Sequence, residues 1–193
     1  AANGGRGYLL LPSSYPSRAD AMAGRTSPGW SSEKYRGVMG ANAAAKISAI
    51  RDGTSHTFLL GEIRAGLSTE DARGTWALGG GPSSLWGYGS GFDANGPNYC
   101  GNNSDDVVDC AKVVSALGEA TLQRECMTCC SNQGNWQQGV RSKHPGGVNM
   151  AFCDGSVHFI SDWIETTGGF GSTWDRLICS DDGMPIDSAK LGL

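Results

Sequence analysis

Apolar and polar residues alternate most regularly between residues 147 and 160, on both sides of an Asp154-Gly155 pair. Asp-Gly between two alternating segments is the strongest short-range signal for a β-hairpin. With Asp154 and Gly155 as a two-residue turn, Phe152 faces Val157, and one face of the hairpin is apolar. A shift by one residue would place Phe152 opposite a polar residue. The pattern therefore predicts a hairpin in this register, with a positive φ at Gly155.

A second strand is predicted over residues 57–63, where Phe58 and Leu60 lie on one face if the alternation is strict. Shorter apolar runs at residues 8–11 and 76–78 predict two more strands. Together with the helix described next, these strands indicate an α+β fold.

Helical spacing of apolar residues is clearest over residues 111–124, although Gly118 weakens this helix. A short helix is also expected to begin within residues 162–166. Between the strands and the first helix, residues 80–110 are rich in Gly, Asn, Ser and Asp and read as a long irregular segment. Helices therefore play a small part in the predicted fold.

Composition agrees with a loop-rich globular chain, because 30 of the 193 residues are glycine and only 18% are charged. This length suits a single domain, residues 1–193, with a Cys/Gly-rich insertion at about residues 80–135. The formal net charge is −4, and no basic stripe stands out. A nucleic-acid partner is therefore not expected.

Two separated motifs carry a family resemblance. His144 precedes Asp154-Gly155 by nine intervening residues, and residues 52–62 read Asp-Gly-Thr-Ser-His-Thr-Phe-Leu-Leu-Gly-Glu, from Asp52 and Gly53 to Glu62. Together they resemble the signature of a large bacterial family of prepilin-processed, pseudopilin-like secreted proteins, a domain of unknown function. The chain departs from the family pattern at His56, where Asn is usual.

The resemblance implies an α+β, pilin-like globular head on a twisted antiparallel sheet, of the kind found in type IV pilins and type II secretion pseudopilins. It also implies a protein that is secreted or at the cell surface. Such proteins also carry a long apolar N-terminal helix, whereas the longest apolar runs here are far shorter than the ~18 residues that a spanning helix needs. We therefore expect the chain to be the C-terminal part of a longer precursor. Its expected partners are further copies in a homopolymer, or the N-terminal half of the precursor, with residues 1–12 pairing with a neighbouring subunit.

Familiar catalytic signatures are missing, including Gly-x-Ser-x-Gly, His-Glu-x-x-His and phosphate-binding glycine loops. His144 is either a metal ligand or general base, or a structural side chain that bonds to backbone or to a carboxylate such as Glu62 or Asp154. The structural alternative is favoured, because a single His without clustered partners is weak evidence for a metal. Glu62, on an otherwise apolar strand, is expected to pair with Arg64, Arg141 or His144.

Seven cysteines suggest an oxidising compartment, and an odd number leaves at least one thiol over. We expect at least two disulfides that hold the glycine-rich insertion together. A metal site or a redox pair is the alternative, but the spacing does not fit common zinc ribbons. The likeliest members lie in the insertion, and two further cysteines could pair with each other or with that cluster; the candidates are Cys100, Cys110, Cys126, Cys129, Cys130, Cys153 and Cys179.

Two groups of acidic residues indicate calcium as a candidate cofactor, because hard oxygen ligands on Gly/Asn-rich loops suit Ca²⁺. Solvated loop acids are the equal alternative, and neither group matches an EF-hand. Residues 102–104 also fit an Asn-glycosylation sequon. The calcium candidates are Asp105, Asp106, Asp109, Asp181 and Asp182.

Taken together, these patterns predict a non-enzymatic structural subunit of an extracellular or cell-surface filament. The runner-up is a secreted carbohydrate-binding module, which six Trp and five Tyr in a Gly/Asn-rich chain suggest. A hydrolase is the third alternative, and it would require a pocket that joins His144 to a nucleophile and an acid.

Overall fold

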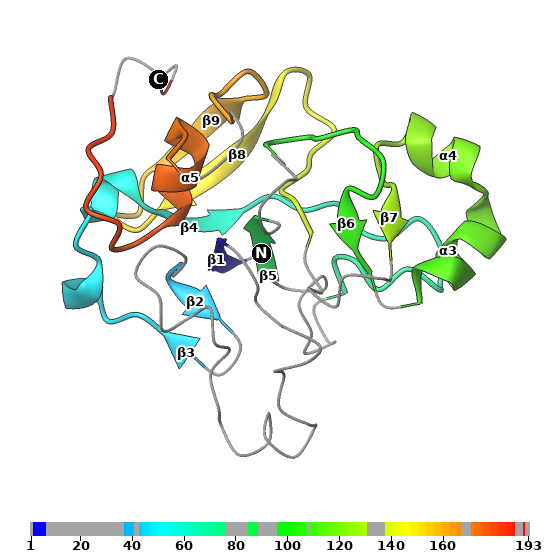
Figure 1. Ribbon diagram of the computed structural model, residues 1–193, viewed down its shortest axis with the longest axis horizontal. Coiled ribbons are helices and arrows are strands. Elements are labelled where there is room, and N and C mark those ends of the chain that lie inside the picture. The colour runs from blue at the N-terminus through cyan, green and yellow to red at the C-terminus, as the bar shows by residue number, and fades with distance from the viewer. Residues whose placement is uncertain are drawn as a thin grey trace.

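The computed structural model describes residues 2–6, 37–40, 43–75, 85–88, 96–107, 109–130, 138–166, 171–187 and 191. These residues form strands and short helices, joined by loops (Figure 1). The strands are β1 Ala2–Arg6, β2 Met39–Gly40, β3 Ala43–Ala44, β4 Phe58–Gly61, β5 Leu85–Tyr88, β6 Asp105–Asp106, β7 Cys129–Cys130, β8 Gly147–Phe152 and β9 Val157–Ser161. The helices are η2 Ile47–Ala49, η3 Thr54–His56, α3 Cys110–Leu117, α4 Glu119–Arg124 and α5 Thr173–Ile178.

The main sheet has five strands in the order β5-β1-β4-β8-β9. Strands β4, β8 and β9 form an antiparallel core, and β1 joins β4 antiparallel. In this sheet, the β1–β5 pair departs from the predicted antiparallel arrangement, because these two strands are parallel. Strands β6 and β7, which form a separate two-stranded sheet, are also parallel. The expected α+β fold is therefore present.

Strand β1 lies inside the sheet of its own chain, where Ala2 is opposite Leu60 of β4 and Leu85 of β5. The expectation that residues 1–12 pair with a neighbouring subunit is wrong for residues 2–6, because both edges of this strand already have partners. Residues 7–12 lie outside the described part of the chain, as does the strand predicted over residues 76–78.

The hairpin of β8 and β9 forms, but the predicted register is wrong by one residue. Phe152 donates its backbone N–H to the carbonyl of Ser156, and Gly155 donates to the carbonyl of Phe152. The loop is therefore three residues long, with Gly155 at φ +90° as its last residue. This register places His158 opposite Met150, where its ring packs edge-on against Phe152, with centroids 5.3 Å apart.

Replacing Gly155 by Val should lower the free energy of unfolding by about 1–3 kcal/mol, because a β-branched residue fits a positive φ poorly. No neighbouring atom lies within 4 Å of where a Cβ would be, so backbone strain alone is tested. Urea denaturation of the variant measures the change. Asn at this position, which tolerates positive φ better, should recover part of the loss. An unchanged transition midpoint for the Val variant would contradict the turn geometry.

Strand β4 contains an irregularity that the sequence pattern did not reveal. Phe58 is opposite Phe152, but Leu60 is opposite Ala151, so the register shifts by one residue between them. Phe58 is consequently buried while Leu60 is partly exposed, contrary to the prediction that they share a face. Gly61 turns inward instead, where a Cβ would lie 2.5 Å from Cγ1 of Val140.

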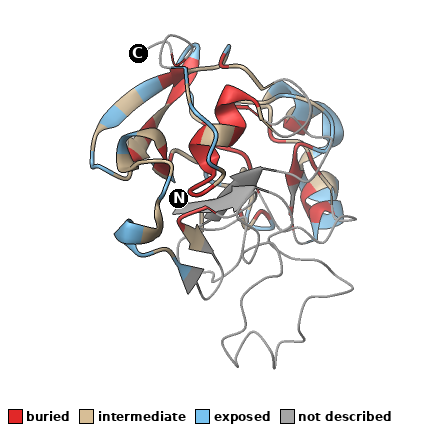
Figure 2. Cartoon of the chain, turned by 60° about the vertical axis from the view of Figure 1, so that its left-hand side comes forward, coloured by how far each residue is buried: buried red, intermediate tan, exposed pale blue. Residues whose placement is uncertain are grey.

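Helix α5 covers the inner face of the sheet. Ser172 and Asp175 form a capping box that starts this helix, and Trp174, Leu177 and Ile178 are buried. The ring of Trp174 lies 5.3 Å from that of Phe58. Figure 2 shows how burial concentrates where helix and sheet meet. The main core therefore lies between α5 and the strands β4, β8 and β9.

A second cluster of buried residues lies under α3 and α4, away from the main core. The helix predicted over residues 111–124 is broken at Gly118, whose φ is +77°. Val113 and Leu122 point into the cluster with Met127. These residues belong to the predicted insertion, so this segment has its own small core. The helix expected within residues 162–166 does not form.

Candidate functional site

The antiparallel pairing of β4 with β8 brings the two sequence motifs together at both ends. At one end, Cys153 donates its backbone N–H to the carbonyl of Thr57, at 2.9 Å, and Asp154 donates to the carbonyl of Thr54, at 3.1 Å. The Asp52 motif thus cradles the Asp154-Gly155 loop. Motifs 80 residues and more apart in the sequence are therefore two halves of one local structure.

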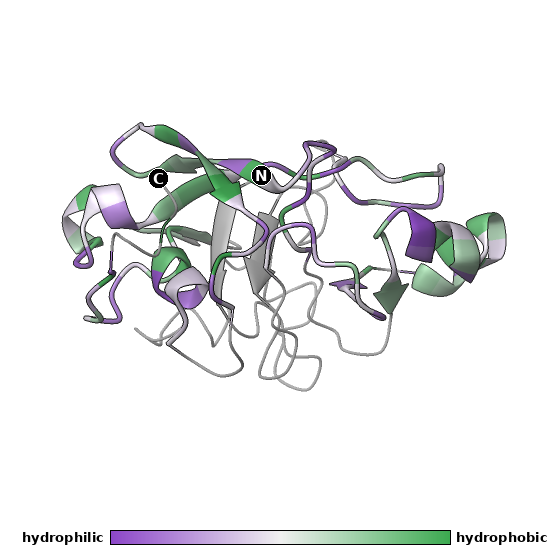
Figure 3. Ribbon diagram, turned by 90° about the horizontal axis from the view of Figure 1, so that it is seen from above, coloured by the Kyte–Doolittle hydropathy of each residue, from purple (hydrophilic) through white to green (hydrophobic). Residues whose placement is uncertain are grey.

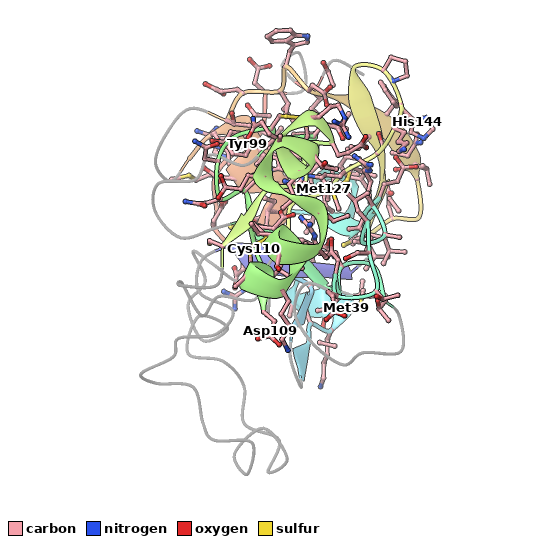
Figure 4. The ribbon with its side chains drawn as sticks, turned by 90° about the vertical axis from the view of Figure 1, so that its right-hand side faces the viewer. Met39, Tyr99, Asp109, Cys110, Met127 and His144 are labelled. Carbon is pink, nitrogen blue, oxygen red and sulfur yellow. A yellow bond between two sulfur atoms is a disulfide. The ribbon has the colours of Figure 1, made fainter. Side chains whose placement is uncertain are left out.

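At the other end of the same strand pair, Glu62 meets His144. Nε2 of His144 lies 3.2 Å from Oε1 of Glu62, and Asn149 donates its backbone N–H to Oε2 at 2.8 Å. The side-chain amide of Asn149 donates to Oε1 at 3.1 Å. Of the partners expected for Glu62, His144 is thus the one that its side chain meets, and this carboxylate fixes the start of the hairpin. Figure 4 shows His144 on the outer side of the molecule.

Hydrogen bonding sets the charge state of Glu62. Burial would raise the pKa of this carboxyl, but the backbone and side-chain donors of Asn149, followed by His144, lower it below its ordinary value. A lowered pKa in the folded state contributes stability above the ordinary pKa, and that contribution is lost as the pH falls through the folded value. Glu62 is therefore held as an anion at neutral pH.

The remaining motif residues also bond to backbone. Asp52 accepts hydrogen bonds from the N–H groups of Asp182, at 2.7 Å, and Gly183, at 2.9 Å, and so ties down the segment after α5. Asp154 accepts from the N–H and the hydroxyl of Ser156, and these bonds lower its pKa. Gly53 has a φ of +95° just before η3. Each of these residues closes a turn.

A hydrolase in which His144 activates a side-chain nucleophile would have a hydroxyl or thiol within hydrogen-bond reach of its ring. The nearby hydroxyl of Ser142 instead donates to the carbonyl of Gly147, at 2.7 Å, and accepts from the backbone N–H of His144. The ring nitrogen contacts Glu62 and Asn149. The geometry around His144 is therefore that of a structural clamp.

Beneath this strand end lies a buried network of four charged side chains. Nη1 of Arg73 lies 2.7 Å from Oδ2 of Asp105, and Nη2 of Arg73 lies 2.7 Å from Oδ2 of Asp71. Nη1 of Arg141 is 2.7 Å from Oδ2 of Asp105. All four residues are buried. Asp105 thus joins the insertion, which carries it, to the segment that leads into β8.

Electrostatics in this network favours the charged form of Arg73. Burial would lower the pKa of the Arg73 guanidinium, but its hydrogen bond to Asp71 and the charges of Asp105 and Asp71 raise it above the ordinary value. Further donors complete the shell, because Gly139 donates its N–H to Asp105 and Leu67 donates to Asp71. Two cations and two anions balance, as a buried network requires.

The five aspartates proposed as calcium ligands do not lie together in one group. Asp105 belongs to the buried network, Asp109 pairs with Lys112, and Asp181 pairs with Arg51. Asp106 is beside Asp105 in β6, and Asp182 lies near Asp52. Among the residues described, no group of three or more His, Cys, Asp or Glu is arranged to hold a metal ion. The calcium expectation is therefore not supported.

The cysteines form two disulfides, both within the insertion, as expected. Cys100 is bonded to Cys126, and Cys110 is bonded to Cys129. Figure 4 places Cys110 at the start of α3. Cys153 is a free thiol, so it pairs neither with Cys179 nor with the cysteines of the insertion. Burial and the charge of Asp154 raise the pKa of the Cys153 thiol to about 11, so it is protonated at neutral pH.

The buried network of Asp71, Arg73, Asp105 and Arg141 was not predicted from the sequence. Arg73 and Asp71 lie in a loop, where charged residues usually face water, and Asp105 was interpreted as a calcium ligand. No short-range pattern distinguishes a buried loop arginine from a solvated one. The one indication in the sequence was Arg141, which lies three residues before His144, the first residue of the second motif.

Comparison with known proteins gives a family but no activity. A family described as "Protein of unknown function (DUF1559)" matches residues 3–167. The chain therefore belongs to this family. No curated protein and no solved structure matches the chain. In the described part of the chain, none of the helices combines the length and the apolar character that crossing a membrane requires.

Proposed function

We propose that this member of the DUF1559 family is a non-enzymatic structural subunit of an extracellular or cell-surface assembly. Its contact surface is the open face of the sheet, defined by Leu60 of β4, Ala151 of β8, and Val157 and Phe159 of β9. The observation that carries the proposal is the exposure of this apolar face: Leu60 is 43%, Val157 63% and Phe159 45% exposed.

Strand register places these side chains together. Ala151 is opposite both Leu60 and Val157, and Phe159 is opposite Asn149, two residues along. Residues two apart on a strand share a face, so the apolar side chains form one surface on the side away from α5. Seen from above, β8 and β9 run along one margin of the molecule, with α5 on their inner side (Figure 3). An apolar surface of this kind favours contact with another chain.

Among the strands that the structure describes, β9 ends the order of the main sheet, so its outer edge has no partner strand there. Natural edge strands usually carry charges, prolines or bulges that prevent pairing with another chain. The sequence of β9, Val-His-Phe-Ile-Ser, contains no Asp, Glu, Lys, Arg or Pro. This edge is therefore suited to strand addition. The partner we propose is a second copy of the chain, whose β9 edge is equally unprotected.

Location and chemistry agree with this role. The two disulfides are typical of proteins that work in an oxidising compartment outside the cytosol. The two sequence motifs close turns and fix the hairpin, which a rigid subunit needs and an active site does not. A carbohydrate-binding module is the second candidate, and the 92% exposure of Trp163 favours it.

Charge on the open face should abolish self-association. The double variant Val157→Lys/Phe159→Lys places two like charges on β9, and these would face each other across a β9–β9 contact. We expect the dissociation constant measured by static light scattering to rise at least tenfold. Ile47→Lys is the matched control, because Ile47 is exposed on η2, outside the sheet. Equal association of the double variant and the unmodified chain would contradict the proposed contact.

A further inference from the structure

An open groove of about 520 Å³ lies between the end of α4 and the loop that leads into β8. Six charged side chains line it, and we name it the basic groove after them: Arg64, Arg124, Glu125, Arg141, Lys143 and Asp162. None of the residues that define the open sheet face lines this groove, although the ring of His144, which does line it, lies edge-on to Phe159 with centroids 6.3 Å apart. Its size is within the range of ordinary ligand sites.

Positive charge dominates this groove, with four basic residues against two acidic ones. The whole chain, by contrast, has a net charge of −4. A local excess of cations on an acidic protein concentrates positive potential at one place. The groove therefore favours an anionic ligand.

Two of the cations are free to meet such a ligand. Nη2 of Arg64 lies 2.8 Å from Oε2 of Glu125, and Arg141 is committed to Asp105. Arg124 and Lys143 are both exposed, and none of the ion pairs formed by the described residues includes either of them. They extend from different elements, α4 and the loop before β8, and both line the groove.

The positive charges of Arg64, Arg124 and Lys143 all act on the carboxyl group of Glu125. Its pKa is lowered by the hydrogen bond from Arg64 first, and then by the charges of Arg64, Lys143 and Arg124. Three cations thus surround one carboxylate. Arg141 adds a fourth positive group that is almost wholly buried, and its Nε has no hydrogen-bond partner among the described residues. The groove consequently has positive charge in its wall and at its rim.

The walls of the groove are held in place before any ligand binds. The side-chain amide of Asn98 donates to Asp162, at 2.8 Å, and to the carbonyl of Gly147, at 3.2 Å. Its carbonyl oxygen accepts from the N–H of Ser142, at 2.8 Å. The Cys100–Cys126 disulfide fixes the end of α4 nearby. A preformed site loses little entropy on binding.

The chemistry of the lining narrows the ligand class. Apart from Cys126, which is in a disulfide, the groove is lined by polar or charged residues, so it does not suit an acyl chain or an apolar peptide. Trp163, which directly follows Asp162, is 92% exposed and offers an aromatic surface for a sugar ring.

We propose that the basic groove binds an acidic polysaccharide, whose carboxylate or sulfate groups lie between Arg124 and Lys143. The repeated anionic groups of such a chain can meet two exposed cations that extend from separate elements of an open groove. Binding is expected to weaken as salt is added, because exposed charges are screened over about 8 Å at physiological ionic strength.

Polysaccharide binding by the unreduced full chain tests this proposal. Isothermal titration with polygalacturonate, dextran sulfate and neutral dextran compares carboxylate, sulfate and uncharged chains. We expect binding to at least one of the acidic polymers and none to neutral dextran, and the stronger of the two identifies the anionic group. The double variant Arg124→Gln/Lys143→Gln should weaken this binding at least tenfold.

Lys46→Gln is the matched control, because Lys46 is exposed and lies outside the groove. Equal binding by the groove variant and this control would overturn the proposal, as would equal binding of neutral dextran or no binding of either acidic polymer. The groove variant should leave light-scattering self-association unchanged, so failure here is distinguishable from failure of the proposed assembly.

Discussion

Replacing Asp105 by Ala is expected to lower the free energy of unfolding by about 3–5 kcal/mol. This carboxylate pairs with both Arg73 and Arg141 and accepts the backbone N–H of Gly139. Its removal leaves two guanidinium groups buried with one carboxylate, Asp71, and an unpaired buried charge is far more costly than an unpaired exposed one. Urea denaturation followed by circular dichroism measures the loss.

Two further variants distinguish buried charge from charge in general. Asp109→Ala removes an exposed partner of Lys112 and should change stability by about 1 kcal/mol or less. Asp105→Asn preserves shape but not charge, and it should still be strongly destabilising. A loss for Asp105→Ala no larger than that for Asp109→Ala would show that the network does not hold the insertion to the sheet.

Removing the Cys110–Cys129 disulfide is the second large effect. The double variant Cys110→Ala/Cys129→Ala should lose about 2–4 kcal/mol, because the bond restricts the unfolded loop between the two residues. Both side chains are also buried in the small core of the insertion, which has little other apolar surface. The transition midpoint in urea, measured without reductant, should fall accordingly.

Cys153→Ala provides the comparison, because Cys153 is a free thiol on the hairpin loop. It should change stability much less than the double variant. Added reductant should lower the midpoint of the unmodified chain towards that of the double variant. A chain whose midpoint is insensitive to reductant would contradict the role of the disulfides.

Local sequence patterns predicted that the strands and the hairpin form. They did not predict the register in which these strands pair. The Asp154-Gly155 pair and the flanking alternation were enough to predict the hairpin, but not its register, because Asp-Gly serves both two-residue and three-residue loops. Likewise, alternation in β4 could not show the shift between Phe58 and Leu60. Register here depends on cross-strand packing, such as that of His158 on Phe152, which no local pattern records.

Long-range contacts explain what the sequence could not show of the site. The contact of His144 with Glu62 was among the expected alternatives, since a carboxylate on an apolar strand needs a partner. The pairing of cysteines and the burial of Asp105 depend on how the insertion folds back onto the sheet. Those contacts join residues tens of positions apart, and charged loop residues give no periodic signal of burial.

The most direct test of the proposed structural role is the mass of the unreduced chain as its concentration rises. Sedimentation velocity, with negative-stain electron microscopy of the same samples, should show species larger than the monomer that grow with concentration and disappear in Val157→Lys/Phe159→Lys. A single monomeric species at every concentration, from the unmodified chain, would contradict the role in assembly.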